Sequence, residues 1–92
     1  MIRTIRHRGL KRAHERGEFR KVQTTHQVRI ATILSDLDVA EEVSDLDLPS
    51  YQLHRLKGDL SGFWSVRVSR NWRIVFRFDE GDAYDVNLVD YH

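Results

Sequence analysis

Side chains able to move protons and bind phosphate lie in two short stretches of the 92-residue chain. His54 and Lys57 stand at the end of a predicted long strand, and Asp90, Tyr91 and His92 are the last three residues. Cleavage of RNA by its own 2′-hydroxyl needs a base, an acid and cations to stabilise the phosphorane, and it needs no metal or cofactor. Histidine serves both proton roles near neutral pH because its reference pKa is about 6.5. The two stretches together would supply this chemistry if the fold brings them together.

A different interpretation of the same residues stays open at this point. A single histidine is more often a surface or core residue than a catalyst, and residues at a chain end are often frayed. Spacing alone therefore does not decide between a nuclease site and ordinary surface side chains.

Arginines recur at alternate positions in the second half of the chain, with Arg67 in one predicted strand and Arg73 and Arg77 in the next. Alternate strand residues share a face and lie about 7 Å apart, close to the separation of successive phosphates. This row of positive charges suits the binding of a polyanion such as a nucleic-acid strand. It equally fits a polar sheet face with ion pairs to nearby aspartates such as Asp79 or Asp85.

The net charge of +1 conceals a strong asymmetry along the chain. Residues 1–29 hold nine Lys or Arg and two Glu, residues 30–50 hold six acids and no Lys or Arg, and residues 51–92 hold six of each. This clustering predicts a basic surface in the first third, with Lys11 and Arg12 as candidate RNA contacts. A solvated helix surface is the alternative.

Composition narrows the class of protein. The chain has no cysteine, so neither a disulfide nor a Cys-containing metal site is expected, and stability must come from an apolar core or a partner. The N-terminus is charged from Arg3 onward, and no stretch approaches the ~18 apolar residues of a membrane helix. We expect a single cytoplasmic domain over residues 1–92.

Two helices are expected in the first half. A short basic helix is predicted over residues 10–16, between two glycines, and a longer one from Thr24 or Thr25 to about residue 39 or 41. The buried stripe of the longer helix is the i, i+3, i+4, i+7 series Ile30, Ile33, Leu34 and Leu37. Residues 44–49 then form a turn, since the residue before a proline avoids helical geometry.

After Pro49 the apolar period becomes two, which predicts strands near residues 64–69 and 72–78 and a last strand over about 84–88. Residues 2–6 also alternate like a short strand. The aromatic sheet face needs cover, and the helices are the only amphipathic elements available. We therefore predict an α+β fold with a mostly antiparallel sheet, N-terminal helices packed on one face, and Arg67, Arg73 and Arg77 on the other.

Four segments in the second half of the chain resemble those of HigB-type toxins, also described as plasmid maintenance system killer proteins, in the RelE/ParE superfamily, and the similarity spans essentially the whole chain. They are residues 51–59 (YQLHRLKGD), 62–68 (GFWSVRV), 71–78 (NWRIVFRF) and 81–86 (GDAYDV), followed by the ending Asp90-Tyr91-His92. The opening, residues 2–11, is similar as well. The resemblance implies a compact RelE-like fold and a toxin that cleaves messenger RNA in the ribosomal A site without metal. It also implies silencing by a helix-turn-helix, HigA-like antitoxin, through which alone the toxin would contact DNA.

The resemblance also implies an active site composed of His54, Lys57, Arg73, Asp90, Tyr91 and His92. Chemistry then assigns His54 or His92 as general base and the other as acid, with Lys57 and Arg73 on the scissile phosphate. Asp90 would orient a histidine, and Tyr91 would stack on a base or donate a hydrogen bond.

Further RNA contacts are expected from Arg67, Arg77, Lys11 and Arg12. Arg55 departs from the family pattern, which often has proline at this position, so a stiff residue is replaced by a charged one beside His54.

Two other functions fit parts of the same sequence. A ParE-like gyrase poison shares the fold but acts on a protein–DNA complex and does not need an RNA-cleaving set of residues. A non-catalytic RNA- or ribosome-binding module would use only the basic first third. Cleavage that disappears with one histidine substitution separates the first function from both.

Overall fold

The computed structural model describes residues 1–90 and begins its helical layer with α1 (Arg8–Arg16). His7 caps this helix, because its Nδ1 accepts a hydrogen bond from the Leu10 N–H at 3.1 Å. Gly17 ends it in the left-handed conformation that glycine adopts without strain. The predicted helix is confirmed, although it starts earlier than expected and includes Gly9.

The second helix, α2 (Gln27–Val39), follows the single turn η1 (Thr24–His26). Its buried stripe is the predicted one: Ile30, Ile33, Leu34 and Leu37. The prediction of a threonine cap is wrong, since Gln23 and His26 occupy the cap positions of η1 and α2 and neither makes a side-chain capping bond. Burial of the apolar stripe therefore stabilises α2, where each fully buried side chain contributes about 1.5–3 kcal/mol.

Short 3-10 turns connect the helices to the sheet. The predicted turn over residues 44–49 is formed by η2 (Val43–Leu46) and the start of η3 (Pro49–Tyr51), and η4 (Gly58–Leu60) lies between the first two strands. No helix within residues 1–90 is long and apolar enough to cross a membrane.

The sheet contains β1 (His54–Arg55), β2 (Trp64–Arg67), β3 (Trp72–Asp79) and β4 (Asp82–Asp90), all antiparallel in that order. The predicted antiparallel sheet is confirmed, and β4 is longer than expected at both ends. The expectation of a long first strand ending near His54 is wrong, because β1 has only two residues. The pairing of β1 with β2 is limited to His54 with Ser65 and Arg55 with Trp64.

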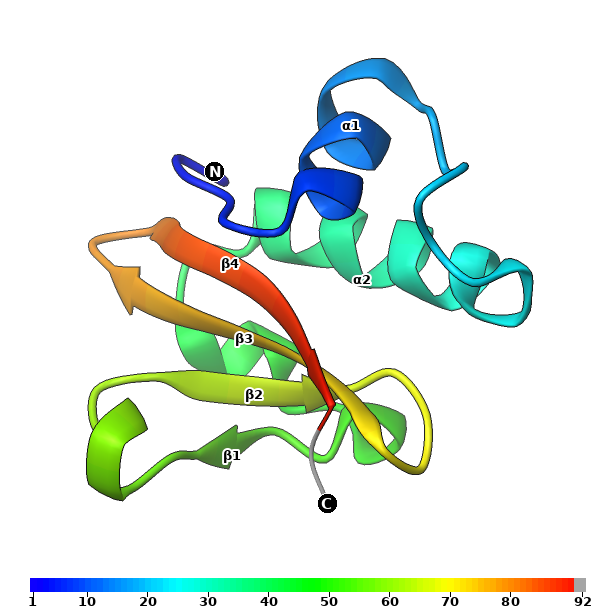
Figure 1. Ribbon diagram of the computed structural model, residues 1–92. Coiled ribbons are helices and arrows are strands. Elements are labelled where there is room, and N and C mark those ends of the chain that lie inside the picture. Colours follow the sequence, from blue (N-terminus) through cyan, green and yellow to red (C-terminus); the bar gives the residue numbers. More distant parts are fainter. Residues whose placement is uncertain (91–92) are drawn as a thin grey trace.

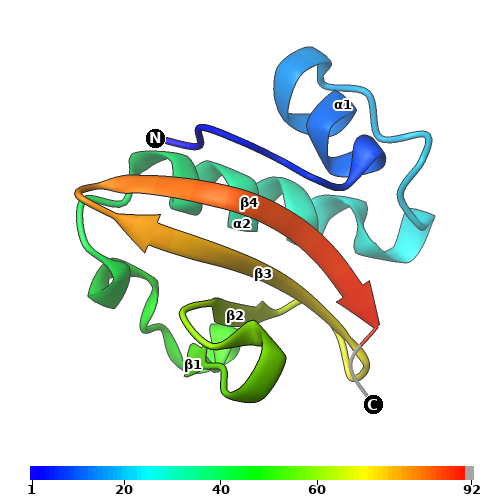
Figure 2. The same ribbon diagram turned by 60° about the vertical axis from the view of Figure 1, so that its left-hand side comes forward.

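The N-terminal segment lies along the outer edge of β4, as Figure 2 shows. Ile2 and Ile5 form isolated parallel bridges with Ala83 and Val86, in place of the continuous strand expected over residues 2–6. The amine of Met1 donates to the carbonyl of Gly81 at 2.8 Å. This segment covers most of an edge that would otherwise expose unpaired backbone groups.

Both α helices cover one face of the sheet, as predicted (Figure 1). The core between the two layers includes Ile30, Ile33, Ile74, Phe76 and Val86, each fully buried. The opposite face of the sheet is where His54, Ser65 and Arg73 lie, because these residues alternate with the core-facing ones. The fold therefore separates the apolar core from the polar residues that carry the candidate chemistry.

Candidate active site

Polar residues gather at one end of the sheet, which we call the site end. Here β2 finishes at Arg67, β3 begins at Trp72, β4 finishes at Asp90 and β1 begins at His54. Figure 2 shows the start of β3 and the end of β4 side by side at this end. Segments far apart in the sequence thus meet because the antiparallel topology returns each strand to the same edge.

Arg73 is held from two sides by neutral oxygens. Its Nη1 donates to the hydroxyl of Ser65 at 3.1 Å and to the carbonyl of Gln52 at 3.4 Å. Ser65 is fully buried, so its hydroxyl has one well-defined position. These two hydrogen bonds fix the orientation of the guanidinium, whose planar set of donors matches the oxygens of a phosphate.

His54 lies directly opposite Ser65 in the β1–β2 pairing. Residues opposite each other in an antiparallel pair share a face, so His54, Ser65 and Arg73 lie on one surface. His54 is exposed there, and its ring is accessible to a substrate. The structure therefore brings together the predicted histidine of β1 and the predicted arginine of β3.

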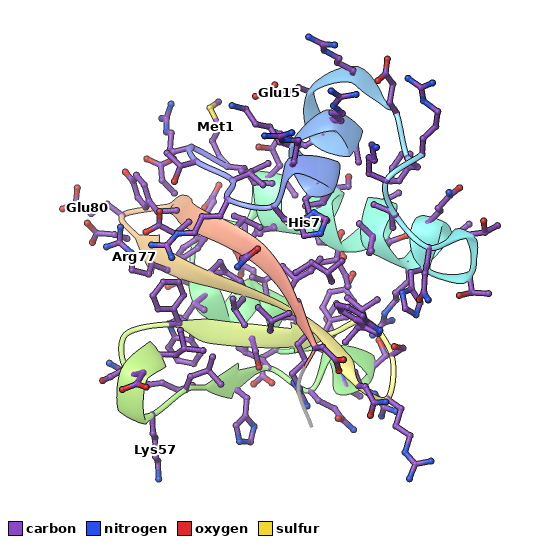
Figure 3. All side chains as sticks on the ribbon, viewed as in Figure 1. Met1, His7, Glu15, Lys57, Arg77 and Glu80 are labelled. Atoms are coloured by element: carbon purple, nitrogen blue, oxygen red, sulfur yellow. The ribbon has the colours of Figure 1, made fainter. Side chains whose placement is uncertain are left out.

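Lys57 lies farther from this pair. It follows β1, immediately before η4, about 10 Å along the chain from His54 at the rise of an extended strand. Figure 3 shows its side chain pointing into solvent, and it forms no ion pair within the described residues. A four-carbon side chain would have to turn toward the site end to reach a phosphate beside Arg73.

Asp90 belongs to the other face of the sheet by its register. It is the partner of Trp72, whereas Arg73 is the partner of Val89. Asp90 is exposed at the last position of β4, and its predicted role of orienting a histidine stays a prediction. Tyr91 and His92, also predicted for the active site, lie outside the described residues.

Arg29 of α2 is a site-supporting residue that the sequence analysis missed. Its guanidinium donates to the carbonyl of Ser50 and, from Nη2 at 2.8 Å and Nε at 3.2 Å, to the carbonyl of Arg67. It also lies over the ring of Tyr51, 4.8 Å from the ring centre. One side chain thus joins the segment before His54 to the end of β2.

Tyr51 fixes the same segment from the helix side. Its hydroxyl donates to Asp36 of α2 at 2.6 Å, and burial together with this carboxylate raises the pKa of Tyr51 to about 12. Tyr51 therefore stays a neutral donor at physiological pH. Neither Tyr51 nor Arg29 carried a sequence signal, because their partners are backbone carbonyls and one of several helix carboxylates.

The remaining predicted RNA contacts are spread over three places. Arg67 lies at the site end, where its Nε donates to the carbonyl of Ser69 at 3.2 Å. Arg77 is at the opposite end of β3 and pairs with Asp85 at 2.9 Å. Lys11 and Arg12 lie on α1, in the helix layer on the other side of the sheet from Arg73. The predicted cations therefore do not form one continuous face.

Metal ligands do not gather in the described part of the chain: among residues 1–90, no three His, Cys, Asp or Glu side chains are placed to share an ion.

Sequence comparisons identify relatives over the full length. The family model described as "RelE-like toxin of type II toxin-antitoxin system HigB" matches residues 3–92. The chain is 45% identical over 92 residues to Endoribonuclease HigB of Proteus vulgaris, covering 100% of both chains. It is 31% identical over 84 residues to Toxin HigB-1 of Vibrio cholerae serotype O1, covering 90% of this chain and 76% of the relative.

Structural comparisons find the same fold at low sequence identity. A chain of the heterotetrameric YoeB–YefM toxin–antitoxin complex from Staphylococcus aureus matches with a TM-score of 0.64 and 18% identity, covering 100% of this chain and 95% of that one. YafQ from E. coli matches with a TM-score of 0.57 and 15% identity, covering 98% and 91%. The predicted RelE-like α+β fold is confirmed.

Proposed function

The chain belongs to the RelE-like HigB toxins of type II toxin–antitoxin systems, and on this premise we propose that it cleaves messenger RNA in the A site of translating ribosomes. The observation that carries the proposal is the surface shared by His54, Ser65 and Arg73, which combines an accessible imidazole with a fixed cation. The name of the Proteus vulgaris relative supports endoribonuclease activity as the reaction.

The reaction is a transfer within the RNA strand itself. A base removes the proton of a 2′-hydroxyl, the 2′-oxygen forms a bond to the adjacent phosphorus, and the bond from phosphorus to the 5′-oxygen breaks. An acid protonates that leaving oxygen, so the products are a 2′,3′-cyclic phosphate and a 5′-hydroxyl. This route requires no metal and no cofactor.

His54 and His92 divide the base and acid roles, with Arg73 and Lys57 stabilising the charge that develops on the phosphorane. Arg73 is suited to this role because its position is set by Ser65 and Gln52 before substrate binds. Asp90 and Tyr91 complete the site by orienting a histidine and by holding an unpaired base.

The ribosome supplies the positioning that this exposed site lacks. His54 and Lys57 both lie open to solvent, so free RNA is held by few contacts and rarely adopts the in-line geometry of cleavage. We expect naked RNA to be cut slowly and translated message rapidly. Equal rates on the two substrates would indicate a general ribonuclease instead.

As a type II toxin, the chain has an antitoxin partner. We propose that this partner is a HigA-like helix-turn-helix protein, that DNA is contacted only through it, and that the toxin works in the cytoplasm, where translating ribosomes are found.

The decisive experiment maps message ends by primer extension after the toxin is induced without antitoxin. Cleavage within translated codons is expected, with growth arrest. His54→Ala should lower cleavage about 100-fold or more, the scale of a lost proton-transfer group, and should leave a folded, antitoxin-binding protein. His14→Ala, on α1 away from the site end, is the matched control and should cut like the parent.

Arrest that persists at full strength in a soluble His54→Ala, Arg73→Ala double variant would count against nuclease action. Double-strand DNA breaks without message cleavage would indicate a gyrase poison.

A further inference from the structure

A small pocket opens between α1, the loop before α2 and the site end of the sheet. Its walls include His7, Lys21, Gln23, His26, Trp72 and Leu88, and its volume is about 150 Å³. Drug-sized ligands occupy about 300–1,000 Å³, and one water takes about 30 Å³. The pocket therefore has room for one flat ring system and not for a whole nucleotide.

The pocket lies next to the end of β4. Leu88 lines it, and Asp90 follows two residues later on the same face, opposite Trp72. Arg73 comes directly after Trp72 and faces the other side of the sheet. The pocket and Arg73 therefore lie at the same end of the sheet, on its two opposite faces.

Side chains in the pocket combine flat rings with hydrogen-bond donors. The rings of His26 and Trp72 meet edge to face, with centres 6.4 Å apart. His7 accepts the Leu10 N–H on Nδ1, which leaves the ring proton on Nε2 as a donor. Burial lowers the pKa of His7, so the ring is neutral near pH 7. The described residues that line the pocket include no carboxylate.

Gly9 is needed to form this wall. A Cβ at Gly9 would lie 2.9 Å from both the Cε1 of His7 and the Cβ of Lys21, closer than real Cβ atoms approach other heavy atoms. Only glycine lets the first turn of α1 come so near Lys21. Figure 3 shows His7 at the start of α1, beside the sheet.

Lys21 also connects the pocket to a basic groove. The neighbouring groove, between α1 and the loop that follows it, is lined by Arg12, Glu18, Arg20 and the same Lys21. Proteins that bind unpaired nucleic acid combine a cationic track for the backbone with aromatic surfaces for the bases. In this chain the pocket supplies the aromatic surfaces, the groove supplies cations, and Lys21 lines both.

We propose that the pocket binds one unpaired nucleobase of the RNA that the toxin meets on the ribosome. The base stacks against Trp72 and His26, His7 donates to one of its ring acceptors, and Lys21 leads the backbone toward the α1 groove. The inference rests on the proposed function for its RNA partner. The base belongs either to the message or to ribosomal RNA beside it, and the chemistry of recognition is the same.

Tryptophan fluorescence tests the pocket without requiring cleavage. Trp64→Phe leaves Trp72 as the only tryptophan. The probe is a 2′-O-methyl pentaribonucleotide, which cannot be cut because the attacking oxygen is blocked, together with versions lacking one base at each position. We expect quenching of Trp72 by the intact probe and loss of that quenching when one particular base is absent.

His26→Ala should weaken binding of the intact probe about 5- to 100-fold, the range of one base–aromatic contact, and His14→Ala should not. Quenching that ignores every base removal, no quenching at all, or equal affinity in His26→Ala would overturn the proposal. If Trp64→Phe does not fold, the indole N–H signals of the unsubstituted chain report the same titration.

Cleavage maps on ribosomes then identify the source of the base. If the base is part of the message, His26→Ala changes the distribution of cut codons; if it is ribosomal, cleavage falls by the same factor at every site. Cleavage identical to His14→Ala at all sites would overturn a role on the ribosome. A chain that binds the pentanucleotide through the pocket and never cuts message would refute the proposed function alone.

Discussion

The arginines at the two ends of the sheet donate hydrogen bonds to different kinds of acceptor. We call the hairpin at residues 79–82, together with the N-terminal segment beside it, the turn end. There carboxylates compensate the cations: Asp82 pairs with the Met1 amine and Arg3, and Asp85 pairs with Arg6 and Arg77. Figure 3 shows Met1, Arg77 and Glu80 together at this end.

At the site end, neutral oxygens accept hydrogen bonds from three arginines. Arg29, Arg67 and Arg73 all donate to carbonyl or hydroxyl oxygens. An ion pair neutralises a guanidinium and an exposed one contributes little stability, whereas a carbonyl holds the group and keeps its positive charge. The comparison teaches that arginine spacing alone does not identify a phosphate site, because Arg73 and Arg77 of the same strand donate to different kinds of acceptor.

The largest difference is expected between two arginines of the same strand. Arg73→Ala should lower cleavage of ribosome-bound message about 100- to 1,000-fold, the cost of one lost donor to a developing negative charge. Arg77→Ala should lower it at most a few-fold, because Asp85 already compensates its charge. Single-turnover cleavage rates measure both, and similar losses for the two variants would remove the distinction between the ends.

Tags at the two termini should separate activity from stability. A hexahistidine tag after His92 should lower cleavage at least about tenfold, since Tyr91 and His92 are predicted to contact the message and small misplacements are costly. A tag before Met1 removes the amine that pairs with Asp82 and should cost less than about 1 kcal/mol of stability.

Cleavage assays and urea unfolding of the two tagged proteins measure these effects. Full activity of the C-tagged protein would exclude Tyr91 and His92 from the site.

Arg29→Lys tests whether neutral acceptors fix the site end. A lysine keeps the charge but cannot span the carbonyls of Ser50 and Arg67 with a planar fork. We expect cleavage to fall about 3- to 10-fold and the free energy of unfolding to fall by about 1–2 kcal/mol.

Arg3→Lys at the turn end is the matched control, because its exposed ion pair tolerates a point charge. Denaturant titration measures the free energy of unfolding of each variant, and cleavage assays at equal folded fractions measure its activity. Equal stability losses in both variants would show that the acceptor type is irrelevant.

The smallest expected effect concerns pH and His7. Burial lowers the pKa of His7 in the folded chain below its unfolded value of 6.5, so the unfolded chain takes up a proton first as the pH falls. The stability from neutral His7 is fully present above about pH 6.5 and is lost below it.

His7→Asn keeps a helix cap and removes the titration. The free energy of unfolding of the parent should therefore fall relative to that of His7→Asn when the pH is lowered from 7.5 to 5.5. Urea unfolding at each pH measures this change. A difference that does not change with pH would refute the effect.

Local sequence patterns predict those helices and strands that can be recognised without knowing what they pack against. The spacing of Ile30, Ile33 and Leu37 is sufficient to predict α2, and the alternation through Ile74 and Phe76 is sufficient to predict β3. The length of the two-residue strand β1 could not be predicted in this way, because it depends on the pairing of His54 with Ser65, a contact between separate segments.

The site was predictable by residue type and not by arrangement. His54 and Arg73 carry recognisable chemistry, and the structure places both on one surface. Ser65 looked like any polar residue of an alternating strand, and Arg29 like one more charge of the basic third. The role of Ser65 depends on burial of its hydroxyl, and the role of Arg29 depends on two backbone carbonyls. Every residue has a backbone carbonyl, so the sequence does not indicate which ones bind Arg29.

The pairing of the first residues with the last strand has a consequence for biogenesis. Met1 contacts Gly81, 80 residues later in the chain, and Ile2 contacts Ala83. These contacts cannot form until β4 has been translated. Contacts of such high sequence separation are slow to close, so we expect this edge of the sheet to form late in folding. An antitoxin present at that stage therefore meets the toxin before this edge has formed.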